Sequence, residues 1–272
     1  MGLFDIRHIN KELTDFGDTV KVRAVTKLDY DLRGNAQLVF GDSKISYLTG
    51  DDANSACYDA NYIAQTFTVG SSDIDISSIK LKIKRTGTCG SMTVGLYAVD
   101  VDNKPTGTVL DEESLDYSDM LDDGDTEWAT FPITYTVSAS TTYAIVVSAT
   151  GADTDNKYDI RTVTTGAYTG GNILTSDDSG DTWTAGTADI LFNILGDTDT
   201  IAMVDVLTQE DEAVQRGIFQ SGDKRFTFKN TESNIVRGTK LYHKTKWYQV
   251  DTIENESLED TELWLSVIAR KI

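Results

Sequence analysis

Short segments in which apolar and polar residues alternate fill the middle of this chain. In the run Ile79-Lys80-Leu81-Lys82-Ile83, every second residue is apolar. Successive side chains of a strand point to opposite faces, so this period places one face on a core and the other in solvent. Six such segments predict strands at 66–69, 79–83, 92–98, 129–133, 143–148 and 190–194. The turns between them are rich in Gly, Asp and Ser, which is typical of a β-sandwich.

The charge is unevenly distributed along the 272 residues. Residues 58–196 contain 21 acidic and 7 basic residues, a net charge of −14, whereas the two flanks together carry only −6 of the total of −20. The flanks also contain most of the Lys and Arg and the only helical patterns. This division indicates a discontinuous domain, 1–43 plus 197–272, interrupted by an inserted domain, 44–196. A tandem arrangement of three units fits the same pattern.

The flanks predict a small β-barrel with one or two short helices. Apolar residues at helical spacing favour a helix over 6–16, and Thr208 can cap a second one over 209–216. A hairpin is predicted from 37–40 and 44–48 around a Gly41-Asp42-Ser43 turn. Further strands are predicted near 20–24, 201–206, 225–228, 240–243, 247–253 and 263–269. Short strands joined by tight turns favour a closed or nearly closed barrel.

The composition argues against several functional classes. Two histidines, His8 and His243, and two cysteines, Cys57 and Cys89, do not form a zinc-binding pattern and leave little for histidine-dependent catalysis. The net charge of −20 argues against non-specific nucleic-acid binding. The sequence contains neither an apolar run of bilayer length nor a secretory signal pattern, so we expect no membrane association.

The middle segment resembles jelly-roll β-sandwich modules related to carbohydrate-binding modules. The matching residues include Gln65-Thr66-Phe67-Thr68-Val69, Val94-Gly95-Leu96-Tyr97, Lys104-Pro105-Thr106-Gly107, Trp128-Ala129-Thr130-Phe131, Tyr168-Thr169-Gly170-Gly171 and Gly180-Asp181-Thr182-Trp183. The resemblance implies a sandwich but does not identify a ligand. The predicted fold class is therefore mainly β: a small β-barrel body with one or two short helices, interrupted by an inserted jelly-roll β-sandwich.

The flanks, taken as one unit, resemble the head-completion proteins of tailed viruses, also called stopper or head-closure proteins. The matching residues are Asp31-Leu32-Arg33-Gly34-Asn35-Ala36, Gln209-Glu210-Asp211-Glu212-Ala213-Val214, Ser221-Gly222-Asp223 and Lys246-Trp247-Tyr248-Gln249-Val250. The resemblance implies a protein made in the host cytoplasm that forms a homo-oligomeric ring in the virion neck, between portal or adaptor and tail proteins. DNA would pass through the ring without specific binding.

Two other interpretations remain open at this stage. The first is a carbohydrate-binding adhesin, or a decoration or baseplate protein of the virion. The second is a glycoside hydrolase that uses carboxylates of the acidic stretch 112–125. We expect that stretch to be a solvated loop, and we therefore expect no enzyme activity.

Candidate ligand-binding residues are few. Trp183 and Tyr168 could stack on sugar rings, and Trp183 is the better candidate because a Gly-Asp turn should leave it exposed; Tyr143 and Trp128 are expected in the core. Acidic loops containing Asp100 and Asp102, Asp153 and Asp155, or residues 177–181 are weak calcium candidates. No cofactor is expected otherwise, and Cys57 and Cys89 could be either bonded or free.

Overall fold

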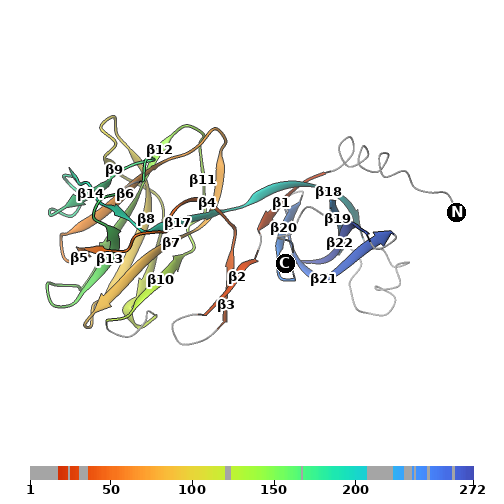
Figure 1. The fold of residues 1–272 in the computed structure, drawn as a ribbon, viewed down its shortest axis with the longest axis horizontal. Helices are drawn as coiled ribbons and strands as arrows, with labels where there is room; N and C mark the ends of the chain where they lie inside the picture. The colour runs from red at the N-terminus through yellow and green to blue at the C-terminus, as the bar shows by residue number, and fades with distance from the viewer. Residues whose placement is uncertain are drawn as a thin grey trace. The chain divides into compact units, whose positions relative to one another are not determined.

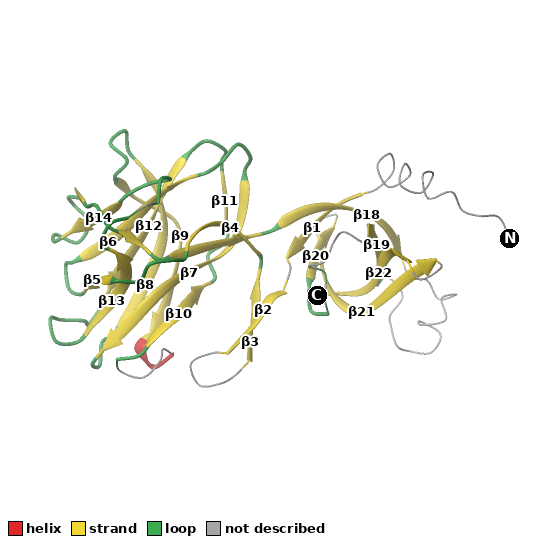
Figure 2. Ribbon diagram, in the orientation of Figure 1, coloured by secondary structure: helices red, strands yellow, loops and turns green. Residues whose placement is uncertain are grey.

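The computed structural model describes residues 18–23, 25–30, 36–119, 124–166, 168–206, 223–229, 235, 237–243, 246–258 and 261–272. Strands dominate the described chain, and the one helical element described is the 3₁₀ turn η1, Tyr117–Asp119 (Figure 2). The predominantly β fold class is thus confirmed. The predicted helices at 6–16 and 209–216 lie outside the described residues.

The inserted part of the chain is a sandwich of two antiparallel sheets (Figure 1). The eight-stranded sheet contains β4 (Asp42–Tyr47), β5 (Ala53–Cys57), β7 (Ile74–Thr86), β10 (Thr126–Phe131), β11 (Tyr135–Val137), β13 (Lys157–Val163), β16 (Asp189–Ile190) and β17 (Phe192–Gly196). The six-stranded sheet contains β6 (Tyr62–Thr68), β8 (Ser91–Val99), β9 (Pro105–Asp116), β12 (Thr142–Ala149), β14 (Ile173–Ser176) and β15 (Thr184–Ala185).

The alternation in the sequence directs one face of each sheet into a common core. On β7, Ile79, Leu81 and Ile83 are buried, whereas the intervening lysines are half-buried on the outer face. From the other sheet, Phe67 and Leu96 enter the same apolar cluster. Burying these side chains stabilises the sandwich, at roughly 25 cal/mol per Å² of apolar surface removed from water.

Three details of the sandwich differ from the sequence predictions. Part of the acidic stretch expected to be a loop belongs to the long edge strand β9, which pairs with β8 from Ser91–Asp116 to Val99–Pro105. No predicted segment covers strands β5, β11, β13, β14 and β15. The predicted hairpin at residues 37–48 is wrong, because β3 (Ala36–Phe40) pairs with β2 (Val25–Tyr30), whereas β4 joins β17 in the eight-stranded sheet.

The two ends of the chain together build a closed barrel. Its strand order is β1 (Asp18–Arg23), β18 (Thr198–Val206), β19 (Lys224–Lys229), β22 (Thr261–Lys271), β21 (Lys246–Leu258) and β20 (Lys240–His243), and β20 pairs back to β1. Phe226, Phe228 and Val267 belong to its buried core. The barrel therefore closes only when the N-terminal strand inserts between β18 and β20.

The chain divides into two compact units. The first consists of Met1–Lys27, Phe40–Asp42 and Asp197–Ile272, and the second of Leu28–Val39 and Ser43–Gly196. The predicted division placed residues 28–39 in the discontinuous domain formed by 1–43 and 197–272, whereas they belong here to the second unit. Within the second unit, the incoming strand β4 and the outgoing strand β17 are hydrogen-bonded neighbours.

Candidate functional site

The outer face of the six-stranded sheet carries the candidate site. On β8, Met92, Val94 and Leu96 face the sandwich core, so Thr93, Gly95 and Tyr97 face outward. The register with β12 places Gly95 opposite Val146 and Tyr97 opposite Ala144. Gly95 has no side chain and Ala144 has only a methyl group, which leaves room above the sheet.

The loop that connects β14 to β15 forms one wall above this face. The Ser176 hydroxyl oxygen accepts a hydrogen bond from the amide of Gly180 at 2.8 Å. The Asp178 carboxylate accepts hydrogen bonds from the amide and the hydroxyl of Thr182, at 2.8 and 2.6 Å. The Thr182 and Ser176 hydroxyls and the Thr182 amide lower the pKa of Asp178 to about 2, so its carboxylate remains charged in all but strongly acidic solution.

Trp183 ends this loop and lies on the sheet. The residue is only 7% exposed and packs with Ala64, Ala144, Val146 and Leu174 in a small cluster separate from the main core. The indole nitrogen Nε1 is buried and has no hydrogen-bond partner within the described parts of the chain. A buried donor without a partner costs free energy, which makes this N–H group notable.

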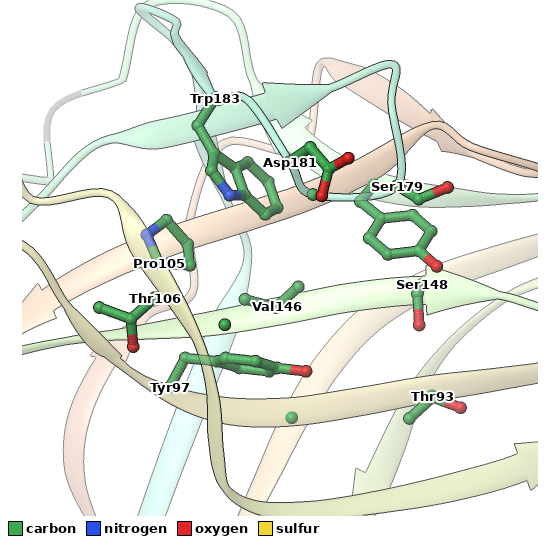
Figure 3. Close-up of a pocket in the computed structure, with 13 residues that line it drawn as sticks. Thr93, Tyr97, Pro105, Thr106, Val146, Ser148, Ser179, Asp181 and Trp183 are labelled. Atoms are coloured by element: carbon green, nitrogen blue, oxygen red, sulfur yellow. The ribbon is translucent and has the colours of Figure 1, made fainter.

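A pocket of about 200 Å³ opens between this loop and strands β8, β9 and β12 (Figure 3). Its lining combines three aromatic rings with small and hydroxyl-bearing side chains: Tyr62, Thr93, Gly95, Tyr97, Pro105, Thr106, Gly107, Val146, Ser148, Ser179, Gly180, Asp181 and Trp183. None of these described lining residues is Lys, Arg or His. Aromatic rings and convergent polar groups in one concave pocket make it the candidate small-molecule site.

The Tyr97 ring depends on the glycine two residues before it. A Cβ atom on Gly95 would lie 2.6 Å from Cε2 of Tyr97, so any larger residue would displace the ring. Burial raises the pKa of Tyr97, and the neighbouring Glu112 and Tyr62 raise it further. The phenol is therefore neutral at physiological pH and can both donate and accept a hydrogen bond.

The structure corrects two of the predictions for aromatic residues and confirms one. Trp183 lines a pocket but is buried, not exposed, because it covers the outer face of the sheet. Trp128 was expected in the core, but it is half-buried and alternates on β10 with the inward-facing Ala129 and Phe131. Tyr143 is buried as predicted.

Tyr168 does not join Trp183 in the pocket. Its ring packs edge-on against Phe192, at 5.2 Å between ring centroids, and contacts the sandwich core. Burial raises the pKa of Tyr168 to about 12, and Asp189 adds to the shift. Tyr168 is therefore a structural residue of the sandwich core. The sequence analysis grouped it with Trp183, but Trp183 lies on the outer face of the six-stranded sheet.

Asp189 and Gln65 form a buried polar link between the two sheets. The Gln65 side-chain amide donates to Asp189 Oδ1 at 3.1 Å, and the Tyr168 backbone amide donates to Asp189 Oδ2 at 3.1 Å. In turn, Gln65 Oε1 accepts a hydrogen bond from the Ile190 amide at 3.0 Å. Burial raises the pKa of Asp189, while the hydrogen bonds from Gln65 and from the Tyr168 amide oppose the shift.

In two of the acidic loops named as calcium candidates, an Asp carboxylate accepts hydrogen bonds from backbone amides of the same turn. Asp100 Oδ1 accepts hydrogen bonds from the amides of Asp102 and Lys104, each at 2.9 Å. Asp153 Oδ1 does the same for Asp155 and Asn156, each at 2.8 Å. No group of three or more metal-ligating side chains occurs within the described residues. Calcium binding stays a prediction.

Cys57 and Cys89 are both buried and are not joined by a disulfide. The Cys57 thiol donates to the carbonyl oxygen of Val147 at 3.6 Å, and burial raises the pKa of Cys57 to about 12. A thiol in this state is a poor nucleophile. Of the two alternatives left open by the sequence, the structure shows the unbonded one.

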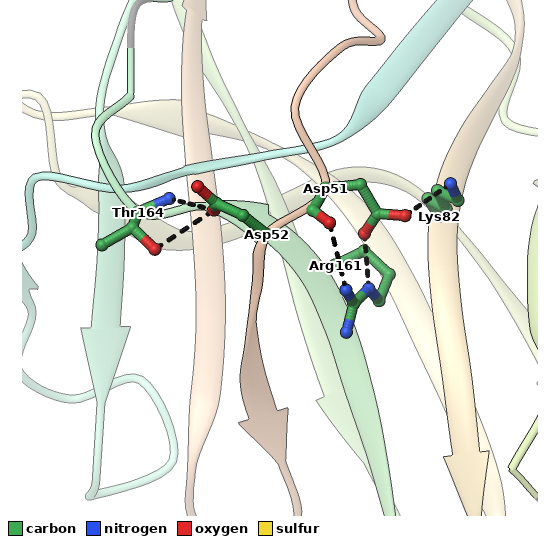
Figure 4. Close-up of polar contacts among 5 residues, drawn as sticks. All are labelled: Asp51, Asp52, Lys82, Arg161 and Thr164. Atoms are coloured by element: carbon green, nitrogen blue, oxygen red, sulfur yellow. Dashed lines mark hydrogen bonds and ion pairs between the residues drawn. The ribbon is translucent and has the colours of Figure 1, made fainter.

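A charged cluster lies on the outer face of the eight-stranded sheet (Figure 4). Asp51 accepts hydrogen bonds from Lys82 Nζ and Arg161 Nε, each at 2.6 Å. Its neighbour Asp52 accepts from the amide and the hydroxyl of Thr164, at 2.8 and 3.1 Å. These contacts fasten the segment between β4 and β5 to the sheet.

Comparisons with known proteins identify no family for this chain. No protein-family model matches it, and no curated protein matches it. Among solved structures, it is similar to a chain of the "Structure of infectious bursal disease virus Gx strain", with 13% sequence identity and a TM-score of 0.24. The match covers 75% of this chain and 52% of that one, so this chain spans about half the length of the viral chain. A likeness this distant establishes neither a shared fold nor a shared function.

The head-completion resemblance thus stays a prediction. Within the described residues, no helix has both the length and the apolar composition needed to cross a bilayer.

Proposed function

We propose that this chain is a structural protein of a virion, specifically a ring-forming component of the head-to-tail connector. In this proposal the barrel makes the contacts with neighbouring copies, with portal or adaptor and with tail proteins. The sandwich is an accessory module that faces outward. Repetition of one small interface around a ring supplies the avidity that a single copy lacks.

The observation that carries the proposal is the barrel closed by both ends of the chain. Strand β1 pairs with β18 and with β20, so residues before and after the sandwich belong to one closed sheet. The neighbouring strands β4 and β17 lead into and out of the sandwich side by side. The flanks that resemble head-completion proteins thus form one body, and the inserted sandwich is a departure from that family. The flanks, which would form the ring, carry a net charge of −6, and this negative charge would reduce adhesion of DNA to a channel wall.

Electron microscopy of intact particles tests this proposal. Particles that carry the full chain are compared with particles in which residues 44–196 are replaced by a short Gly/Ser linker. We expect the difference density to lie at the neck, outside the channel. Difference density on a capsid face or at the tail tip, with none at the neck, would contradict the connector assignment.

A second candidate function is carbohydrate binding, in an adhesin or in a decoration or baseplate protein of the virion. The specific observation that favours it is the pocket lined by Tyr62, Tyr97 and Trp183. Aromatic rings offer flat apolar surfaces to a ligand, and their polar atoms still reach hydrogen-bond partners. This candidate is compatible with a virion location, because an outward module can carry the pocket.

A further inference from the structure

The unpartnered indole N–H of Trp183 is the first observation that points to a ligand. Trp183 is only 7% exposed, and its indole nitrogen lacks a hydrogen-bond partner among the residues that the structure describes. Figure 3 shows this nitrogen on the side of the ring that faces Pro105 and Val146, which both line the pocket. A ligand that brings an acceptor oxygen to this position would satisfy the donor.

The second observation is the combination of a ring face with hydroxyl groups. Figure 3 shows the Tyr97 ring lying along the sheet, with Trp183 on the opposite side of the pocket. Hydroxyl groups of Thr93, Ser148 and Ser179 stand among the lining residues. A pyranose ring has C–H groups that pack on an aromatic face and equatorial hydroxyls that both donate and accept hydrogen bonds. The lining supplies partners for both kinds of surface.

The charge of the lining restricts the ligand further. Asp181 lines the pocket, Glu112 is close enough to Tyr97 to raise its pKa, and the described lining includes no cationic side chain. An acidic ligand would meet like charges without a compensating cation, which disfavours its binding. A neutral ligand meets no such cost.

The size of the pocket limits how many sugar rings a ligand can place in it. Its volume of about 200 Å³ lies below the roughly 300–1,000 Å³ of pockets that bury drug-sized ligands. The loop that forms one wall is held in place by hydrogen bonds that the Gly180 and Thr182 amides donate to Ser176 and Asp178, so the pocket is preformed. One sugar ring, such as the terminal unit of a glycan, matches this space.

We propose that the pocket formed by Tyr97, Trp183 and Asp181 binds one neutral pyranose unit, with the Trp183 indole N–H donating to a ring or hydroxyl oxygen and the Tyr97 ring packing against a C–H face. This inference rests on the second candidate function, in which the sandwich binds carbohydrate. It does not depend on the connector role of the barrel.

The experiment uses the full chain and a panel of methyl glycosides followed by ligand-observed NMR and calorimetric titration. The neutral probes are the methyl glycosides of glucose, galactose, mannose, N-acetylglucosamine and N-acetylgalactosamine, and methyl glucuronide is the charged counterpart of methyl glucoside. Trp183→Phe removes the N–H donor but keeps an aromatic ring, and Tyr97→Leu removes the ring face. Trp128→Phe, on the outer face of the other sheet, is the matched control. Thermal unfolding verifies that each variant is folded.

We expect at least one neutral glycoside to bind, with Kd raised roughly tenfold by Trp183→Phe and by Tyr97→Leu, as expected for the loss of one buried hydrogen bond or one ring contact. The Trp128→Phe protein should keep the Kd of the unaltered chain, and methyl glucuronide should bind more weakly than methyl glucoside. If a neutral glycoside binds but neither pocket variant changes its Kd, the pocket assignment is overturned and carbohydrate binding stands. If no neutral glycoside binds, both are overturned. Tighter binding of the glucuronide would overturn the neutral class.

Discussion

Gly95 and Tyr97 lie two residues apart on β8 and both face away from the sandwich core. Since a Cβ atom on Gly95 would lie 2.6 Å from the Tyr97 ring, Gly95→Ala should push this ring away from the sheet and distort the pocket. We expect changed NMR signals for the Tyr97 ring and the Trp183 indole, together with lost stability. Gly70→Ala is the control, because a Cβ atom there would meet nothing within 4 Å and Gly70 does not line the pocket. Unchanged signals in the Gly95→Ala protein would show that the ring does not rest on Gly95.

Asp189 is the buried acceptor of the link between the sheets. Asp189→Ala would leave the Gln65 side-chain amide and the Tyr168 backbone amide without their acceptor in a buried site. The free energy of unfolding should fall by about 2–3 kcal/mol. Urea denaturation of the variant measures this loss, with Asp102→Ala, in an exposed turn, as the comparison. A loss no larger than that of Asp102→Ala would mean that the link contributes little.

At the scale of elements, the segment between β4 and β5 is fastened to the eight-stranded sheet by Asp51. Burial alone would raise the pKa of Asp51, but hydrogen bonds from Lys82 and Arg161 and their charges outweigh it and leave the pKa below its ordinary value. A lowered native-state pKa means that the stabilisation is fully present above about pH 4 and is lost as the pH falls through the native-state pKa.

Asp51→Ala should therefore lower the free energy of unfolding by about 1–2 kcal/mol at pH 7. The difference from the unaltered chain should shrink below about pH 4. As the pH falls, the Asp51 carboxylate is protonated first in the unfolded chain and then, at lower pH, in the native state. Urea denaturation at several pH values measures both effects. A difference that stays constant down to about pH 2 would exclude the charge of Asp51 as its cause.

Elements with clear alternation were predictable from the sequence, and their partners were not. The inward Ile79, Leu81 and Ile83 identify β7 because the period of two is a local property. The edge strand β9 escaped prediction because exposed acidic residues such as Glu112 and Asp116 are typical of solvated loops, although charges also protect an edge strand from unwanted pairing. The pairing of β4 with β17 joins residues about 150 positions apart, as in the bond from Ser43 to Asn193, and local patterns carry no information about it.

The candidate site was predictable only in part for a similar reason. Trp183 was identified from its turn, but its burial depends on Ala64, Ala144 and Val146, which lie on two other strands. Tyr97 was missed as a site residue because its segment reads as an ordinary strand. The signal that could have found it is Gly95, a glycine inside a strand, which often marks the close approach of another group.

At the scale of the whole molecule, the chain combines a barrel closed by both of its ends with a sandwich that has its own core. Because β4 and β17 are neighbours, the sandwich begins and ends at adjacent strands, as is common where domain insertion is tolerated. The barrel strands pair with one another in a complete circle and need no strand of the sandwich to close it. We therefore expect the barrel to fold without the sandwich, as a connector body with an accessory module requires.

Calorimetry of a variant in which residues 44–196 are replaced by a short Gly/Ser linker, combined with circular dichroism, tests this expectation most directly. We expect a β-type spectrum and one cooperative unfolding transition, because the barrel core around Phe226, Phe228 and Val267 is complete in the variant. An unfolded spectrum without a transition would contradict the assignment of the two chain ends to one autonomous body, and with it the basis for the proposed connector role.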